Sequence, residues 1–332
     1  MEMPKFVQIE PVGQCNLRCQ MCSIQFRADG PPHGPLAFID FELFTRLVDQ
    51  FVGAEELHLQ GLGEPLMYPR FAEMVRYAKA RGLRVTTNSN LTILNARRAA
   101  ELVASRLDCL HVSIDGATAE TYERIRVRAR LAHVVRNLKL LVEAKQSLAS
   151  ETPHLQMVVV IMRQNLAELP ALVRFAHEHG FEAVFVQHLC HDYGEAELPE
   201  RYLPMRDFVR SQTLLGEDAA LVKSSFTEAR ALAAQLGLEL RLPQLQPRAH
   251  QPDTPGPERC DWPWRGAYLS YQGLAMPCCM ISTPDRLNFG SMAEAGVTAV
   301  WSGPAYEEFR QRLSSDDPPE VCRSCSIYSG TF

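Results

Sequence analysis

Short apolar runs that alternate with helical segments fill the first 190 residues, and this alternation limits the folds open to the chain more than any other feature. Six runs are candidate strands, at residues 6–9, 56–60, 84–87, 109–114, 156–161 and 183–187. Helices are expected between them, at residues 40–51, 69–81, 95–106, 118–126, 132–148 and 167–179. Repeated strand–helix units predict a parallel sheet with right-handed crossovers. No G-x-G-x-x-G fingerprint follows the first run, so a six-unit partial barrel is at least as compatible with the pattern as an open doubly wound sheet.

The pattern changes after about residue 195. Two helices are expected at 204–214 and 217–235, and the proline- and glutamine-rich "RLPQLQPRAHQPDTPGPER" follows them as a connector. The rest of the chain is rich in cysteines and turns, with a hairpin-like "AYLSYQGLAMPCC" and a closing helix at 304–314. We therefore expect three parts, which cover residues 1–200, 201–255 and 256–332.

Charge and hydropathy argue against some classes of function. The chain has a formal net charge of −5 and its lysines and arginines are scattered, so nucleic acid is disfavoured as a partner. There is no uninterrupted apolar stretch of 18 residues, and no basic segment followed by an apolar run at the N-terminus. We therefore expect a cytoplasmic protein without a membrane segment.

Ten cysteines in such a protein are more often metal ligands or catalytic groups than disulfides. Cys15, Cys19 and Cys22 form the pattern C-x3-C-x2-C directly after the first predicted strand, at the face of a parallel barrel where active sites gather. A structural zinc site needs four ligands, whereas three thiolates can hold a [4Fe-4S] cluster and leave one iron open to another ligand. A zinc site or a set of buried thiols is the alternative.

These residues and four further segments carry a resemblance to a known family. "CNLRCQMC" at 15–22 resembles the signature of the radical S-adenosylmethionine (radical SAM) superfamily. The segments that resemble its later motifs are "LQGLGEPLMYP" at 59–69, "VTTNSN" at 85–90, "VSIDG" at 112–116 and "YERIR" at 122–126. The resemblance implies a partial (β/α)6 TIM-like barrel, with a [4Fe-4S] cluster and S-adenosylmethionine as cofactors.

The same resemblance implies roles for single residues. Cys15, Cys19 and Cys22 would ligate the cluster. Gly63 and Glu64 would contact the amino group of the methionine part of the cofactor. Further cofactor contacts, to the ribose or the carboxylate for the last two, are implied for Asn88, Ser113 and Arg126.

The C-terminal cysteines resemble, in their spacing, the auxiliary-cluster domain called SPASM in its short "twitch" form. Its four ligands would be Cys260, Cys278, Cys322 and Cys325. The resemblance implies a small iron–sulfur domain with a second [4Fe-4S] cluster, which is suited to electron transfer because the protein closes all four positions. Cys279 competes with Cys278, but two neighbours seldom reach one cluster with good geometry, so we prefer Cys278. A four-cysteine zinc ribbon is the alternative.

The loop after the sixth predicted strand contains the candidate catalytic side chains. Cys190 would be a hydrogen donor that faces the pocket, and an inert cysteine is the alternative. His188 would orient the substrate or take a proton from it. Because loops are polar in any case, this assignment is the least specific of the set.

We expect an enzyme that cleaves S-adenosylmethionine reductively to a 5′-deoxyadenosyl radical and abstracts hydrogen from its substrate. The predicted first strand begins within about five residues of Met1, so no leader-peptide-binding domain is expected before the barrel. This favours the oxidation or rearrangement of a sugar, cyclitol or similar natural-product precursor. A maturase that crosslinks or epimerises a ribosomal peptide is the first alternative, and a non-catalytic iron–sulfur or zinc protein is the second. An external electron donor, such as flavodoxin or ferredoxin, is expected as a partner.

Overall fold

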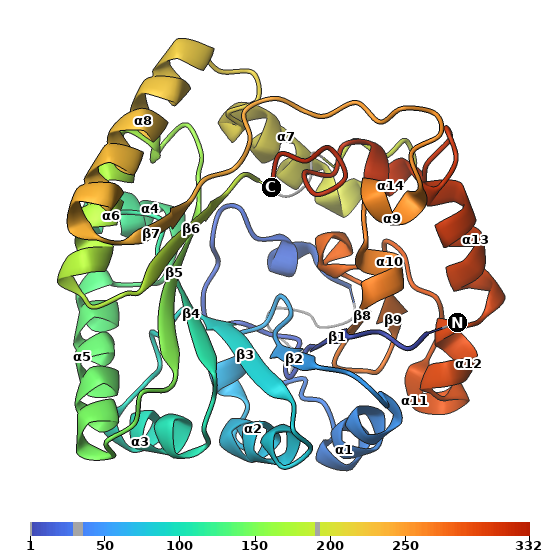
Figure 1. The fold of residues 1–332 in the computed structure, drawn as a ribbon, viewed down its shortest axis with the longest axis horizontal. Helices are drawn as coiled ribbons and strands as arrows, with labels where there is room; N and C mark the ends of the chain where they lie inside the picture. Colours follow the sequence, from blue (N-terminus) through green and yellow to red (C-terminus); the bar gives the residue numbers. More distant parts are fainter. Residues whose placement is uncertain (1, 29–35, 190–192) are drawn as a thin grey trace.

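The computed structural model describes residues 2–28, 36–189 and 193–332 of the chain. Within these ranges a curved sheet of nine strands forms the centre, in the order β7-β6-β5-β4-β3-β2-β1-β8-β9 (Figure 1). Only β8 and β9 pair antiparallel; the other neighbours are parallel. The strands are β1 (Phe6–Ile9), β2 (Glu56–Leu59), β3 (Arg84–Ser89), β4 (Cys109–Ser113), β5 (His154–Val160), β6 (Ala183–Gln187), β7 (Glu239–Arg241), β8 (Gly266–Leu269) and β9 (Ala275–Met276).

Helices cover the outer side of the curved sheet (Figure 1). The crossover helices are α1 (Phe41–Gln50), α2 (Phe71–Lys79), α3 (Ala96–Ala104), α4 (Ala119–Ile125), α5 (Leu131–Ser147) and α6 (Leu169–Glu178). The later helices are α7 (Leu203–Gln212), α8 (Ala219–Leu236), α9 (Gly256–Arg259), α10 (Trp262–Arg265), α11 (Met292–Ala295), α12 (Val297–Trp301), α13 (Pro304–Leu313) and α14 (Glu320–Arg323). In the described part of the chain, no helix is both long and apolar enough to cross a membrane.

The predicted partial (β/α)6 barrel is confirmed. β1 and β6 match the predicted runs at both ends, and the four strands between them begin and end within two residues of the prediction. The sequence did not predict β7, which pairs with β6 at one edge of the sheet. It did predict the hairpin of β8 and β9, but not that β8 would pair in parallel with β1. The division into parts at residues 200 and 255 stays a prediction.

Alternation along the strands separates an apolar face from a polar one. Residues such as Val7, Leu57 and Val85 belong to the main core. The residues that alternate with them point to the opposite, concave face; the polar ones include Gln8, His58, Gln60, Thr86, Asn88, His111 and Gln156. The rings of His58 and His111, which come from β2 and β4, approach to 5.9 Å between centroids. Closed barrels fill this space with branched apolar side chains, so a polar wall here is suited to binding a ligand.

Candidate active site

The three N-terminal cysteines lie in the loop between β1 and the short helix η1 (Ser23–Phe26). This loop is held against the end of α4 by its backbone. The Arg18 amide donates to the Val127 carbonyl at 3.0 Å, and the Gln20 amide donates to the Ile125 carbonyl at 2.9 Å. The cysteine loop therefore has a defined path over the carboxyl ends of the strands, where the sequence placed it.

The three thiols lie close together, and Glu64 is a neighbour of Cys15; we call this site the cysteine pocket. Burial raises the pKa of Cys15 and Cys22, and it raises the pKa of Cys19 to about 12. The charge of Glu64 raises the pKa of Cys15 further, and so do the other two thiols. A metal that binds such thiols deprotonates them. The pocket therefore fits a positively charged metal centre, which would offset the cost of burying several negative charges together.

Side-chain donors point at two of the sulfurs. The side-chain amide nitrogen of Asn90 lies 3.6 Å from Cys15 Sγ, and an Arg126 guanidinium nitrogen lies 3.9 Å from Cys19 Sγ. Hydrogen bonds to sulfur are a usual feature of ligating thiolates and tune the cluster. Among the described residues, no three histidine, cysteine or acidic side chains are arranged around a single metal ion. A four-iron cluster does not require that, because each thiolate binds a different iron.

Glu64 is a buried carboxylate with three donors of its own. It accepts from the Ser89 hydroxyl at 2.7 Å, and from the backbone amides of Asn90 at 2.8 Å and Leu66 at 3.1 Å. Burial nevertheless raises the pKa of Glu64, and the hydrogen bonds lower it by less. A cationic ligand beside this carboxylate would replace the solvation that the group has lost. The site fits an ammonium group, as the resemblance implied.

Gly63 lets the turn that carries Glu64 pack directly against the cysteine loop. A Cβ atom at this position would lie 1.9 Å from the Val12 carbonyl oxygen and 2.7 Å from the Gln14 carbonyl oxygen. The Glu64 amide donates to the same Gln14 carbonyl at 2.9 Å. Only glycine permits this approach, and the approach is what places Glu64 beside Cys15.

Arg126 is held in the pocket by Asp115, which the sequence analysis did not single out. The Arg126 Nε and Asp115 Oδ2 atoms are 2.6 Å apart, and the two side chains are at most 9% exposed. Asp115 Oδ1 accepts from the Val160 amide at 2.8 Å. The pair puts a fixed positive charge next to Cys19. Whether Arg126 also contacts the cofactor stays a prediction.

Asn88 and Ser113 lie on the strands that line the concave face. Asn88 Oδ1 lies 2.9 Å from His111 Nδ1, and the two residues are register partners on β3 and β4. Ser113 ends β4, with its side chain half-buried. Within "VTTNSN", it is Ser89 and Asn90 that reach Glu64. The cofactor contacts of Asn88 and Ser113 stay predictions.

Two histidines present an unprotonated nitrogen to their surroundings. An amide oxygen only accepts, so the contact with Asn88 places the proton of His111 on Nδ1 and leaves the Nε2 lone pair free. His188 Nε2 donates to the Gln244 carbonyl at 3.0 Å, and its buried Nδ1 has no partner in the described part of the chain. Burial lowers the pKa of His188, and it lowers the pKa of His111 to about 3. Both rings are therefore neutral acceptors. Cys190 lies outside the described residues.

Glu10 and Arg27 join the cysteine loop to its neighbours, and sequence reasoning missed them as well. Arg27 donates to both carboxylate oxygens of Glu10, at 2.7 and 3.0 Å, and both side chains are fully buried. Glu10 also accepts from the Leu62 amide at 3.0 Å and from the Tyr271 amide at 3.4 Å. The pair thus connects both ends of the loop with the Glu64 turn and the β8–β9 turn. Ion pairs between distant residues have no local sequence signal.

Replacing Glu10 by glutamine is expected to lower the free energy of unfolding by about 3–5 kcal/mol, because Arg27 then stays buried without a counter-charge. Urea denaturation followed by tryptophan fluorescence measures the change. Asp108→Asn is the matched control: its pair with Lys79 is also bidentate, but the two side chains are 27% and 24% exposed. We expect a loss of about 1 kcal/mol there. Equal losses in the two variants would contradict this account of Glu10.

The four C-terminal cysteines of the predicted second cluster line one narrow cavity. Cys260, Cys278, Cys322 and Cys325 all border it, and Cys279 does not. Burial raises the pKa of Cys322, and the other three thiols raise it further, so the four groups are close enough to interact. The remaining lining residues are Trp262, Pro263, Pro277, Met280, Ile281, Phe309, Leu313, Val321, Ile327 and Tyr328. A dry wall with four thiols fits a fully coordinated cluster.

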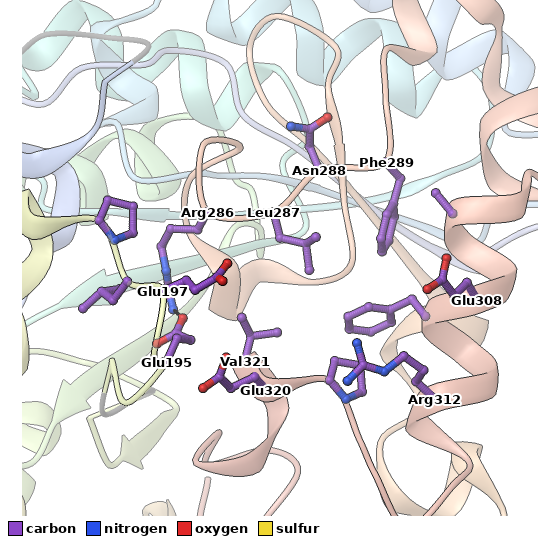
Figure 2. Close-up of a pocket in the computed structure, with 15 residues that line it drawn as sticks. Glu195, Glu197, Arg286, Leu287, Asn288, Phe289, Glu308, Arg312, Glu320 and Val321 are labelled. Carbon is purple, nitrogen blue, oxygen red and sulfur yellow. Dashed lines mark hydrogen bonds and ion pairs between the residues drawn. The ribbon is translucent and has the colours of Figure 1, made fainter.

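A larger groove, of about 470 Å³, shares lining residues with this cavity, and Figure 2 shows the side chains that line it. Residues 195–199, residues 286–289, α13 and residues 319–321 surround it. Phe309 and Val321 line both the groove and the cysteine cavity. The groove thus borders the second metal site, whereas none of the N-terminal cysteines lines it.

Comparisons with known proteins agree with both parts of the site. Residues 9–176 match the family model of the radical SAM superfamily, and residues 260–326 match that of the iron–sulfur cluster-binding domain SPASM. A tungsten-containing aldehyde ferredoxin oxidoreductase cofactor-modifying protein from Pyrococcus furiosus is 24% identical, over 97% of this chain and 87% of that protein. A PqqA peptide cyclase from Ruegeria pomeroyi is 27% identical, over 94% of this chain and 77% of that protein.

Solved structures share the fold. SuiB from Streptococcus suis, bound to S-adenosylmethionine, superposes with a TM-score of 0.69 at 14% identity, over 99% of this chain and 72% of that one. The protein anSMEcpe with bound AdoMet gives a TM-score of 0.61 at 15% identity, over 99% of this chain and 88% of that one. The chain therefore belongs to the radical SAM superfamily and carries a C-terminal SPASM domain: it is an enzyme whose cofactors are two iron–sulfur clusters and S-adenosylmethionine.

Proposed function

We propose that this enzyme is a peptide maturase, which crosslinks or epimerises residues of a ribosomal peptide. The observation that carries the proposal is the alignment with PqqA peptide cyclases over 94–98% of the chain. SuiB, whose fold is similar, has been solved with its precursor peptide SuiA. These relatives favour the peptide alternative over the sugar or cyclitol substrate that the sequence first suggested.

We assign the cofactors to the two groups of thiols. Cys15, Cys19 and Cys22 would hold the cluster that leaves one iron open. Gly63 and Glu64 would hold the ammonium group of S-adenosylmethionine, and Ser89 and Asn90, which both donate to the Glu64 carboxylate, would orient it. The second cluster would be held by Cys260, Cys278, Cys322 and Cys325. The barrel, linker and auxiliary domain are proposed to span residues 1–200, 201–255 and 256–332.

The polar concave face suits a peptide because backbone amides need partners when they leave water. His111 Nε2, on the concave face, carries a lone pair that can accept an amide or hydroxyl proton of the substrate, and the buried Nδ1 of His188, just after β6, is a second acceptor without a partner among the described residues. Asn88 and the Gln244 carbonyl fix the tautomer of each ring, so the acceptors are oriented before the substrate arrives. The wall thus offers specific hydrogen bonds rather than a purely apolar contact.

When bound, the reduced cluster and S-adenosylmethionine together supply the radical that takes a hydrogen atom from the substrate. For a crosslink, the substrate then loses a proton and one more electron, which together with the abstracted hydrogen atom make up its two-electron oxidation. His111 or His188 would accept the proton. The electron would leave toward the cavity of the four C-terminal cysteines, and an external donor of the flavodoxin or ferredoxin type would return electrons to the protein.

Incubation with the precursor peptide encoded beside its gene, in heavy water, is the direct test. We expect a product lighter by two hydrogen masses for a crosslink, or heavier by one deuterium for an epimer. Replacing His188 by phenylalanine should reduce product by about 10²-fold or more, as for loss of a general base, while 5′-deoxyadenosine still forms. His179→Phe, the same substitution at the C-terminal cap of α6, is the matched control. Modification of sugar or cyclitol phosphates, with the peptide unchanged, would contradict the proposal.

A further inference from the structure

The groove next to the C-terminal cysteines has no role in the function proposed above. We call it the acidic groove, and Figure 2 shows its side chains. Its volume of about 470 Å³ falls within the range of about 300–1,000 Å³ that is usual for ligand sites. It is lined by Glu195, Glu197, Leu198, Pro199, Arg286, Leu287, Asn288, Phe289, Ala305, Glu308, Phe309, Arg312, Pro319, Glu320 and Val321.

The charges of the acidic groove favour a cationic ligand. Its four glutamates outnumber its two arginines. Arg286 forms a buried ion pair with Glu195, the two side chains being 1% and 9% exposed, so its charge is already compensated. Glu197, Glu308 and Glu320 are exposed at the rim. Arg312 lines the groove, but its guanidinium lies 3.7 Å from the carboxylate of Asp317, which does not line it. A lysine or arginine side chain would therefore be attracted here, and a negatively charged partner would be repelled.

The floor of the acidic groove is apolar and already packed. Phe289 and Phe309 meet edge to face, with 5.4 Å between ring centroids, and Phe289 also packs on Tyr306 at 4.2 Å. Tyr306 is fully buried and donates to the Met276 carbonyl at 3.1 Å, which anchors the cluster of rings. Such a floor can bury an apolar side chain without first rearranging.

The acidic groove is also coupled to the second metal site. Phe309 and Val321 separate it from the cavity of the four cysteines. Glu320 and Val321 begin α14, the helix that carries Cys322. The Glu320 side chain accepts from the Ala196 amide at 2.7 Å, so the two sides of the groove are already connected. A ligand seated here would contact the wall of the auxiliary site from outside.

We propose that the acidic groove binds a segment of the substrate peptide that carries basic and apolar side chains, at a distance from the residues that are modified. This inference rests on the proposed peptide substrate. An extended segment of a few residues would place its apolar side chains on Phe289, Phe309 and Val321. Its lysine or arginine side chains would lie between Glu197, Glu308 and Glu320. The groove would thereby select the peptide and hold it beside the auxiliary site.

Fluorescence anisotropy with the reconstituted enzyme tests this directly. The probe is a fluorescein-labelled peptide, Leu-Lys-Phe-Leu-Lys-Leu, and the same peptide with glutamate in place of lysine is its control. Glu308→Lys should weaken binding of the lysine peptide by about tenfold, as expected for a like charge at an interface. Glu307→Lys on the same helix is the matched control, because Glu307 is exposed but does not line the groove. It should change binding by less than about twofold.

Turnover of the precursor peptide separates this inference from the proposed function. If both hold, Glu308→Lys raises KM about tenfold with kcat unchanged, and Glu307→Lys does not. Normal modification of a peptide with equal effects of the two variants would overturn the groove as its docking site and leave the function standing. The inference would also be overturned if the glutamate peptide bound as tightly as the lysine peptide, or if a second copy of the enzyme covered the groove in solution. An enzyme that modifies no peptide at all would instead contradict the proposed function.

Discussion

Replacing Cys15, Cys19 and Cys22 together by alanine is expected to abolish formation of 5′-deoxyadenosine and to halve the bound iron, from about eight to about four per chain. The three thiols lie in one pocket with Glu64, and donors from Asn90 and Arg126 already point at two of them. Without them, the pocket has no thiolate left to hold an iron–sulfur cluster. Anaerobic reconstitution, iron and sulfide analysis, and dithionite reduction with S-adenosylmethionine measure the result.

The C-terminal cysteines provide the matched control. Alanine at Cys260, Cys278 and Cys322 should also halve the iron, since all three line one cavity, but 5′-deoxyadenosine should still form. Alanine at Cys279, which does not line that cavity, should leave about eight irons. Loss of deoxyadenosine in the C-terminal variant alone would reverse the assignment of the two sites. Zinc in place of iron would contradict the cluster assignment altogether.

Replacing Glu64 by glutamine is expected to lower the affinity for S-adenosylmethionine by about 10²- to 10⁴-fold. The carboxylate is buried, and a ligand ammonium beside it would form an ion pair out of contact with water. Removing one partner of such a pair costs about 3–5 kcal/mol, which corresponds to this loss of affinity. Equilibrium dialysis with the reconstituted enzyme measures binding, and the rate of deoxyadenosine formation at saturating cofactor follows the chemistry.

The iron content of Glu64→Gln should stay unchanged, because no carboxylate ligand is required for the cluster. Glu168→Gln is the control for general damage: Glu168 accepts from the Ala117 amide at 2.7 Å and from Thr118, but it lies outside the cysteine pocket. That variant should bind S-adenosylmethionine normally. Normal binding by Glu64→Gln, with Glu168→Gln unaffected, would remove Glu64 from the cofactor site.

Local patterns made the barrel strands and the cysteine motif predictable. An apolar run of four to seven residues before a helical period identifies a strand of a parallel sheet, and β1 and β6 were located to the residue. C-x3-C-x2-C and the Gly63–Glu64 turn are short segments whose chemistry depends on neighbours in the chain. The backbone brings them together at the carboxyl ends of β1 and β2 because parallel strands share one active edge.

Contacts between distant segments were not predictable in the same way. β8 pairs with β1 although Phe6 and Gly266 lie at opposite ends of the chain, and β7 is only three residues long. The Glu10–Arg27 and Asp115–Arg126 pairs form inside the fold, where burial makes each charge depend on its partner. On β2 and β4, polar residues at every second position were a signal for the concave wall. His58 and His111 lie in otherwise apolar runs, however, and such runs are equally typical of strands that are buried on both faces.

The sequence alone determined the order of strands and helices, the ligand types and the class of chemistry, because these follow from hydrophobic period and from spacing within short segments. The tertiary structure alone decided which groups face one another. It paired Asn88 with His111, turned His188 toward Gln244, and excluded Cys279 from the cysteine cavity. It also placed the acidic groove against the auxiliary site. The physical reason is that hydrogen-bond partners, tautomers and dry cavities arise from register and packing between segments far apart in the chain.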